Sequence, residues 1–399
     1  MKLRSFYKKV YQNKVLVFRL SSFIRLYTKV TFKSISQNFT RIISRNIIQT
    51  SLSKFKIHKM KRYFIALIVA FMAVGLYAQD TTEEMEKEEM FKVPPISLTG
   101  SVDAYFRSNI EAPATSFANL NGFALGMVNL VASHEGKKAG FVGDLVFGPR
   151  GADAVFLSEG SSNIVNQLYA YLNVSDNLKL TLGNFNTFLG YEVISPTGNF
   201  NYSTSYMFSY GPFSHTGLKA DFSFDGGFSL MLGVFNGTDF TDFQPVADQF
   251  GLTEDADYFG GAQLGYEFDN GGAWLNALFT DGFYQLDFTG GIDITDALYL
   301  GLNATTAQDS FSGIAGYAQV ATSDAFSIGG RIEFFNDEAG LTYGIPDESI
   351  IAFTISAQYK VDNLTIIPEF RIDSTDSDVF DSGTSGSLAS FLVAAVYGF

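Results

Sequence analysis

The stretch IAFTISAQYKV, residues 351–361, alternates apolar side chains with small or polar ones at every second position. This period of two is typical of an extended β-strand with one apolar face. The same alternation recurs in GLKADFSFD (217–225) and AQLGYEF (262–268), and it continues from Ile96 to Phe399. The segments run about 9–12 residues, which is the length that a tilted strand needs to cross a bilayer.

A soluble β-sandwich also alternates, with its apolar face turned inward. Three features argue against it. The strands are longer than the usual length of about 5–6 residues. Their apolar face is rich in Phe, Leu and Tyr without a second, matching set of apolar faces, and the chain carries an export signal. We therefore predict an all-β protein, a transmembrane antiparallel up-and-down β-barrel, because closure leaves no unpaired strand edge in lipid.

Asp, Asn and Gly mark the reversals between strands, as tight hairpins require. Short turns alternate with longer segments, as outer-membrane barrels alternate periplasmic turns with external loops. Seven short turns separate eight hairpins, so we expect about 16 strands, give or take one hairpin, a size that leaves an aqueous channel. The short turns are Glu135–Lys138, Asp176–Asn177, Asp225–Gly227, Asp269–Gly272, Asp296–Ala297, Ser323–Asp324 and Asp362–Asn363. The longer segments are Asn109–Leu120, Pro149–Asn163, Asn186–Ser203, Asn236–Asp257, Asn336–Ser349 and Asp373–Ser387, with shorter reversals near Asp281 and Gln308.

The residues before the barrel fall into three pieces. Residues 60–78 have a basic start, an apolar stretch too short for a comfortable membrane span and a small residue, Ala78, at the end. This pattern predicts a secretory signal peptide, with an uncleaved anchor as the alternative. Residues 1–59 should not precede such a signal, so we interpret them as a non-native extension, with a mitochondrial presequence as the alternative. Residues 79–95 are predicted to be an acidic periplasmic spacer, and residues 96–399 the barrel.

Charge is divided sharply along the chain. Residues 1–59 hold 14 Lys and Arg and no acid, whereas from Gln79 onward 11 Lys and Arg face all 41 Asp and Glu, a net charge of −30. A surface this acidic repels nucleic acid, so no nucleic-acid partner is expected. The chain has no cysteine, which excludes disulfides and thiolate metal sites.

Two acidic loops, 239–257 and 373–381, hold clustered carboxylates of the kind that can bind Ca²⁺. Neither loop has the full ligand pattern with its glycine and terminal glutamate. Simple solvated loops are the alternative to a calcium site, and we predict no metal and no cofactor.

The chain ends on SFLVAAVYGF, residues 390–399, in the middle of a strand pattern. The last strand of a barrel closes against the first, so the chain can end there. The ending resembles the C-terminal recognition signal of outer-membrane barrels, with Phe399 terminal and Tyr397 and Ala395 on the same face. The barrel-assembly machinery and outer-membrane lipid are therefore the expected partners.

Residues 183–222 resemble the OmpL-like family of outer-membrane β-barrel porins. The resemblance is specific over these residues and looser over the last strand and the whole-chain layout. It implies a pore in the outer membrane of a Gram-negative bacterium, and the Ala-Gln at the end of the signal is similar to the Bacteroidetes style. The family gives the class of protein and not the solute. The matching pieces are Gly183-Asn184-Phe185, Gly190-Tyr191-Glu192, Asn201-Tyr202-Ser203 and the run from Pro212 to His215-Thr216-Gly217.

Parity along the strands, assuming no bulges, assigns charged side chains to the channel interior. The interior is then mixed and slightly acidic, which predicts a weak cation preference at low salt. The basic set is Arg107, Lys179, Lys219, Arg331, Lys360 and Arg371. The acidic set is Asp103, Asp144, Asp221, Glu267, Asp287, Asp293, Glu333 and Glu369.

Two pairs in this set, Arg331 with Glu333 and Glu369 with Arg371, lie two residues apart on one face of a strand. Such pairs could set the electric field at a constriction. The alternative is that they solvate the inner wall and pair with each other, because any water-filled barrel has a polar interior.

The third hairpin carries the loop Asn186–Ser203, which contains Tyr191 and Glu192. In general porins the third external loop often folds inward and narrows the channel. By this analogy we predict that the loop forms the constriction with Glu192 facing the opening, and an outward surface loop is the alternative.

The predicted function is an outer-membrane porin for passive diffusion of small hydrophilic solutes or ions. A substrate-selective porin, for example for oligosaccharides, is the alternative, since Tyr105, Tyr169 and Tyr171 face the interior by parity. An outer-membrane enzyme is less favoured, because Ser214 and His215 are strand neighbours that point to opposite faces. A homotrimer is consistent with 16 strands by analogy of fold alone.

Overall fold

The computed structural model describes residues 95–109, 111–243 and 258–399. The predicted signal peptide, the basic extension and all but the last residue of the acidic spacer lie outside these residues, as does much of the acidic loop 239–257. No helix in the described part of the chain is both long and apolar enough to cross a membrane.

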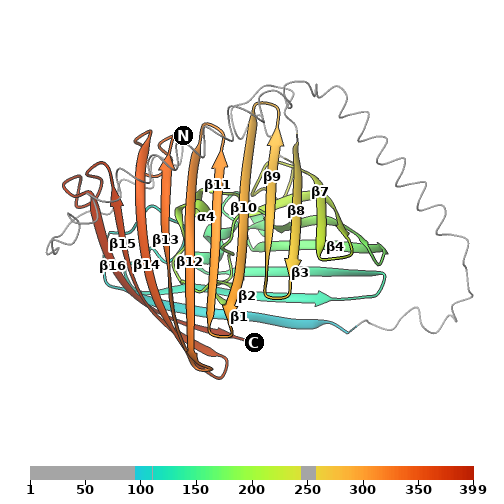
Figure 1. Cartoon of the computed structure of the whole chain (residues 1–399), viewed down its shortest axis with the longest axis horizontal. Helices are drawn as coiled ribbons and strands as arrows, with labels where there is room; N and C mark the ends of the chain where they lie inside the picture. Colours follow the sequence, from blue (N-terminus) through green and yellow to red (C-terminus); the bar gives the residue numbers. More distant parts are fainter. Residues whose placement is uncertain (1–94, 110, 244–257) are drawn as a thin grey trace, which may run out of the picture. The chain divides into compact units, whose positions relative to one another are not determined.

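Sixteen antiparallel strands form a closed barrel in which each strand pairs with its neighbours in sequence and β16 pairs with β1 (Figure 1). This is the predicted up-and-down barrel with the predicted number of strands. The strands are β1 (Ser97–Arg107), β2 (Gly122–His134), β3 (Ala139–Phe147), β4 (Val165–Ser175), β5 (Leu178–Asn186), β6 (Ser214–Ser223), β7 (Phe228–Phe235), β8 (Phe259–Phe268), β9 (Gly271–Thr280), β10 (Phe283–Thr295), β11 (Leu298–Ala307), β12 (Phe311–Ser323), β13 (Phe326–Asp337), β14 (Glu348–Val361), β15 (Leu364–Thr375) and β16 (Ser387–Gly398).

The reversals fall where the Asp, Asn and Gly clusters predict them, and the loop after β5 differs most in length. The loop after β5 runs over residues 187–213, ten residues beyond the predicted end at Ser203. Those ten residues include a short helix, α4 (Tyr206–Tyr210), which the sequence pattern does not predict. The other short helical elements of the described residues also lie in loops: α3 (Pro149–Ala154), η6 (Gly160–Ser162) and η7 (Pro196–Gly198).

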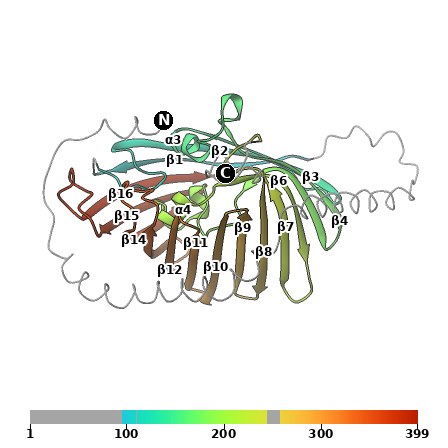
Figure 2. The ribbon, with the colours of Figure 1, turned by 90° about the horizontal axis from the view of Figure 1, so that it is seen from above.

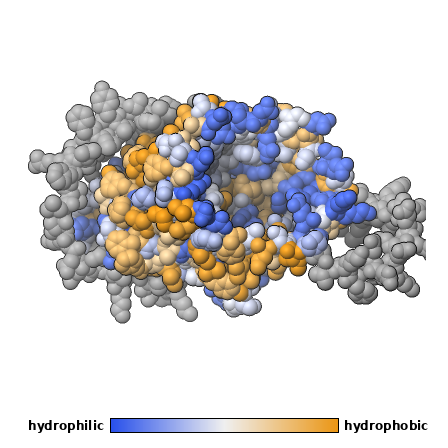
Figure 3. All heavy atoms as spheres, turned by 90° about the horizontal axis from the view of Figure 1, so that it is seen from below, coloured by the Kyte–Doolittle hydropathy of each residue, from blue (hydrophilic) through white to orange (hydrophobic). Residues whose placement is uncertain are grey.

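The outer wall of the barrel is apolar. Outward positions such as Phe123, Leu125 and Leu182 are exposed to the surroundings, while their sequence neighbours in the strands turn inward. On the face seen in Figure 3, apolar residues gather on parts of the outer wall and polar residues border a hollow. This distribution is the inverse of a soluble sandwich and fits a lipid-facing surface.

The last strand closes the barrel as expected. Tyr397 pairs with Val102 and Ala395 with Ala104, and the backbone of Phe399 exchanges two hydrogen bonds with Gly100 at 2.8 and 2.9 Å. Tyr397 and Phe399 are exposed on the outer face of the barrel. Their reading by the assembly machinery stays a prediction.

Apolar side chains also gather inside the barrel, near the end that carries the long loops. Strand parity places them inward, and they pack together with loop residues Leu189, Tyr206 and Met207 in one buried cluster. The simple alternation rule predicts a polar interior, but this part of the interior is apolar. The wall residues of this cluster include Phe185, Phe235, Phe259, Leu278, Phe283, Phe311, Phe335 and Ile350.

Candidate channel interior

Loop 187–213 enters the barrel, and α4 lies within the ring of strands (Figure 1 and Figure 2). The helix begins after Ser205, whose hydroxyl accepts the N–H of Phe208 at 3.0 Å as an N-cap. Tyr206, Met207 and Phe208 are buried. The loop thus lies inside the barrel, where Glu192 is buried and paired with Arg331; that it forms the constriction with Glu192 facing the opening stays a prediction.

Two wall glutamates hold the loop by its backbone. Glu333 of β13 accepts the N–H groups of Tyr206 at 2.9 Å and Met207 at 2.8 Å. Glu369 of β15 accepts those of Tyr202 at 2.8 Å and Ser203 at 3.1 Å. Hydrogen bonds to an ionised acceptor are stronger than neutral ones, and here the acceptors are buried away from water.

Two wall arginines complete the attachment. Arg331 of β13 forms an ion pair with Glu192 and donates to the carbonyl oxygen of Ser203 at 3.0 Å. Arg371 of β15 donates to the carbonyl oxygen of Thr204 at 2.6 Å and pairs with Asp373 at 2.7 Å. The salt bridges of these arginines are therefore to Glu192 and Asp373, and not to Glu333 and Glu369 as the alternative of mutual pairing predicts.

Further contacts reach the loop from other strands. Asp287 of β10 accepts the N–H of Gly190 at 2.8 Å. Asp103 of β1 accepts the hydroxyl of Tyr202. Asn201 donates to the hydroxyl of Ser356 on β14 at 2.7 Å. The loop is thus attached to strands that lie on several sides of the interior.

The remaining predicted interior residues lie apart from this attachment. Arg107 is buried and donates to the Ser390 hydroxyl at 3.2 Å. Lys219 and Asp221 pair with each other at 3.1 Å and stay partly exposed, with side-chain exposures of 24% and 27%. They belong to the open part of the interior.

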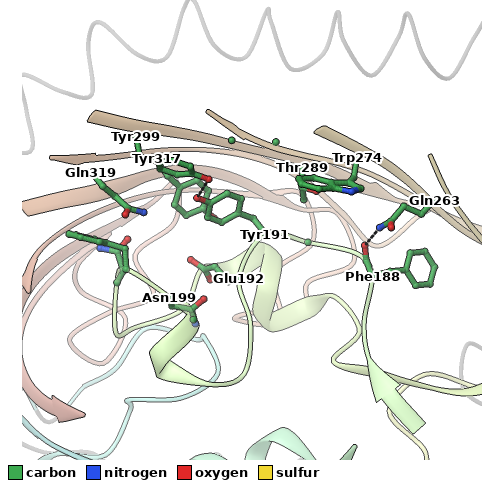
Figure 4. A pocket seen from close by; sticks show the side chains of 16 residues that line it. Phe188, Tyr191, Glu192, Asn199, Gln263, Trp274, Thr289, Tyr299, Tyr317 and Gln319 are labelled. Atoms are coloured by element: carbon green, nitrogen blue, oxygen red, sulfur yellow. Dashed lines mark hydrogen bonds between the residues drawn. The ribbon is translucent and has the colours of Figure 1, made fainter. Parts of the chain in front are cut away.

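A cavity of about 430 Å³ remains between the loop and the wall (Figure 4). The loop contributes Tyr191 and Glu192, and the wall contributes Trp274, Tyr299 and Gln319 among others. The wall residues lie within a few positions of the short turns, so the cavity is in the short-turn half of the barrel. The three tyrosines predicted from parity to face the interior, Tyr105, Tyr169 and Tyr171, do not line this cavity.

The sequence reasoning missed several residues of this interior. Arg150, next to Pro149 at the start of α3, is buried and donates to the carbonyl oxygens of Ile194 at 2.9 Å and Tyr202 at 3.3 Å. It lies in a segment interpreted as a surface loop, so parity could not assign it. The inward phenylalanines near the long loops could have been found, because they continue the same inward parity as the charged residues.

The closed 16-strand barrel, its apolar outer wall and its loop-filled interior define a β-barrel of the outer membrane, of the porin class. The family described as "Putative beta-barrel porin-2, OmpL-like" matches residues 95–399. The chain belongs to this family, and the protein is located in the outer membrane.

Solved structures with the same fold are also porins and outer-membrane proteins. An anion-selective porin from Comamonas acidovorans is 11% identical, with 76% of this chain and 99% of that chain covered and a TM-score of 0.53. OprB from Pseudomonas putida is 11% identical, with 76% and 94% covered and a TM-score of 0.53. A loop-deletion mutant of OmpT from Vibrio cholerae is 12% identical, with 76% and 99% covered and a TM-score of 0.50. At these identities the likeness concerns the fold alone, and no curated protein matches the sequence.

Proposed function

We propose that the protein is a porin through which small hydrophilic solutes and ions diffuse passively, with the interior loop 187–213 narrowing the path. The observation that carries this proposal is the attachment of the loop to the inner wall through Glu333, Glu369 and Arg331. A segment held there reduces the width of a barrel that is otherwise large enough for an aqueous channel.

We further propose a weak cation preference. Among the buried acidic and basic side chains of the described residues there are ten carboxylates and four arginines. Several of these carboxylates, such as Glu333 and Asp287, are bonded to N–H donors of backbone or amide groups. Such donors stabilise the charge without cancelling it, so the interior keeps a negative potential that favours cations at low salt.

An enzymatic function is not proposed. Among the described residues, His215 is the histidine inside the barrel, and its Nε2 lies 2.9 Å from the hydroxyl of Thr187. The His215 ring contacts the rings of Phe188 and Phe235, with centroids 5.1 and 5.0 Å away, and His215 is fully buried. A hydroxyl and a base enclosed in this way are not accessible to a substrate.

The test is the conductance of the protein, extracted from outer membranes, in a planar bilayer with a KCl gradient. Stable steps and a small reversal potential of cation-favouring sign are expected. Replacing residues 189–211 by a short Gly-Ser turn should raise the conductance several-fold. Since such a deletion can impair folding, Glu369→Ala serves as a second variant that frees the loop in part.

An absence of conductance in the natural protein, while it migrates as a folded heat-modifiable barrel, would contradict the porin proposal. Equal conductance in the natural, loop-shortened and Glu369→Ala proteins would contradict the role of the loop. The homotrimer stays a separate prediction, which the native mass of the detergent-extracted protein tests.

A further inference from the structure

The cavity beside loop 187–213 offers polar groups that have no partner in the described part of the protein. In the described residues the side-chain amide of Gln319, the hydroxyl of Thr289 and the indole N–H of Trp274 form no hydrogen bond. By contrast, Gln263 donates to the carbonyl oxygen of Phe188 and to Asn276. Figure 4 shows these side chains lining the same space. Together they supply an amide, a hydroxyl and an indole donor for a ligand.

Aromatic rings form a large part of the remaining surface. Tyr191 and Tyr317 are stacked with their ring centres 4.0 Å apart, and the Tyr191 hydroxyl donates to that of Tyr299 at 2.8 Å. Trp274, Phe188 and Phe200 also line the cavity. Ring faces of this kind bind the C–H faces of a ligand, while neighbouring polar groups fix its orientation.

Inward-facing glycines of the wall leave room for these rings. A methyl group at Gly301 would lie 2.6 Å from the Tyr191 hydroxyl, and one at Gly291 would lie 1.9 Å from the Tyr299 hydroxyl. A methyl group at Gly272 would lie 2.5 Å from the Trp274 ring. The rings of Tyr191 from the loop and of Tyr299 and Trp274 from the strands therefore lie directly over glycines of the wall.

The cavity presents no charge that is free to pair with a ligand. Glu192 is its charged lining residue, and it is already paired with Arg331 and accepts the N–H of Ser205 at 2.7 Å. A charged ligand would leave its own charge uncompensated in a half-enclosed space. The lining fits a neutral molecule with many hydroxyl groups and apolar C–H faces.

We propose that this cavity is a binding site for a neutral mono- or disaccharide. Its volume of about 430 Å³ lies within the range of small-ligand sites, about 300–1,000 Å³. The short-turn end of an outer-membrane barrel faces the periplasm, so the sugar binds on the inner side of the loop. This inference rests on the proposed porin function, for which it names a solute class.

The chain contains a single tryptophan, Trp274, so intrinsic fluorescence reports on this cavity directly. Titration of the detergent-extracted protein with glucose, maltose or cellobiose should give a saturable change in Trp274 emission. Glucose 6-phosphate should give none. Thr289→Val and Gln319→Ala should each shift the midpoint of the titration upward by roughly threefold to tenfold, as expected for one lost hydrogen bond.

The second measurement is the block of single-channel current by the same sugars. Trp274→Ala should raise the half-blocking sugar concentration roughly tenfold. Leu275→Ala is the matched control, since Leu275 is the next residue of β9 and is exposed on the outer wall. It should leave the block unchanged.

The two measurements separate the two proposals. Normal conductance with no sugar-dependent emission change and no block would overturn the sugar site and leave the porin. Saturable emission changes without conductance would support the site and overturn the porin. Equal midpoints in the natural, Thr289→Val and Gln319→Ala proteins would place sugar binding elsewhere and overturn the assignment of the cavity.

Discussion

Removal of the Glu333 carboxylate should release the start of α4 in loop 187–213 from the wall. In the structure this fully buried carboxylate accepts two backbone N–H groups at the start of α4, at 2.9 and 2.8 Å. A hydrogen bond to a charged acceptor contributes about 1.5–3 kcal/mol. Glu333→Ala removes the acceptor of both hydrogen bonds, and the alanine side chain offers no replacement. The attachment of the loop is therefore weakened by about 3–6 kcal/mol.

A loss of about 3 kcal/mol raises the population of the detached segment on the order of a hundredfold. Hydrogen exchange of peptides covering residues 202–210 should accelerate accordingly, whereas exchange in the strands should not change. Single-channel conductance should rise at the same time. Glu333→Gln is expected to show exchange and conductance between those of the natural protein and of Glu333→Ala. Its one amide oxygen accepts one backbone N–H, while its NH₂ group faces the other.

Glu267→Ala is the matched control, since it removes the same charge from an exposed position on β8. It should leave the hydrogen exchange of residues 202–210 as it is. If the Glu333→Ala barrel stays folded and the exchange of residues 202–210 is also unchanged, the loop is held by apolar packing, and the reasoning from hydrogen bonds is wrong.

Three further predictions concern groups outside this attachment. Burial raises the pKa of the Asp239 carboxyl to about 6, so its stabilising contribution is complete at low pH and is lost as the pH rises from about 4 to about 6. The free energy of unfolding should therefore be about 1 kcal/mol higher at pH 5 than at pH 7. Asp239→Asn keeps the acceptor oxygen and should remove this difference when thermal unfolding is measured at both pH values. A difference of the same size in Asp239→Asn would show that Asp239 is not its source. Gly301→Val should push the Tyr191 ring aside and weaken sugar block, with the barrel still heat-modifiable, because a Cβ there meets that ring at 2.6–2.9 Å; an unchanged block would show that the ring is not needed. Asp221→Asn should shift the reversal potential in a KCl gradient toward anions and Lys219→Gln toward cations, since both side chains are partly exposed; shifts of the same sign would contradict an electrostatic origin.

The sequence predicts the barrel well because its signals are local. Alternation along a segment such as residues 351–361 determines which side chains face the interior, and Asp, Asn and Gly determine where the strand reverses. Arg331, Glu333, Glu369 and Arg371 are all buried on the inner side, as parity requires. Here the prediction needs no contact between distant residues.

The partners of these residues could not be predicted in the same way. Arg331 pairs with Glu192, which lies 139 positions away in the chain. The contact depends on the path of the loop, and that path depends on all of the wall residues that attach to it. Likewise α4 spans five residues, too few to be stable alone, and it forms where Ser205 and Glu333 accept its free N–H groups.

The carboxylates of Glu333 and Glu369 both attach the loop and contribute to the proposed cation preference. Had the loop been held by Lys or Arg on the wall alone, each contact would have reduced the negative charge of the interior. Glu333 and Glu369 instead bind backbone N–H groups, which leaves their charge in place. Glu333→Ala should therefore raise conductance and lower cation preference together, whereas Asp221→Asn, away from the loop, should lower the preference without raising conductance. A Glu333→Ala channel with larger conductance and undiminished cation preference would show that the selectivity arises from other charges.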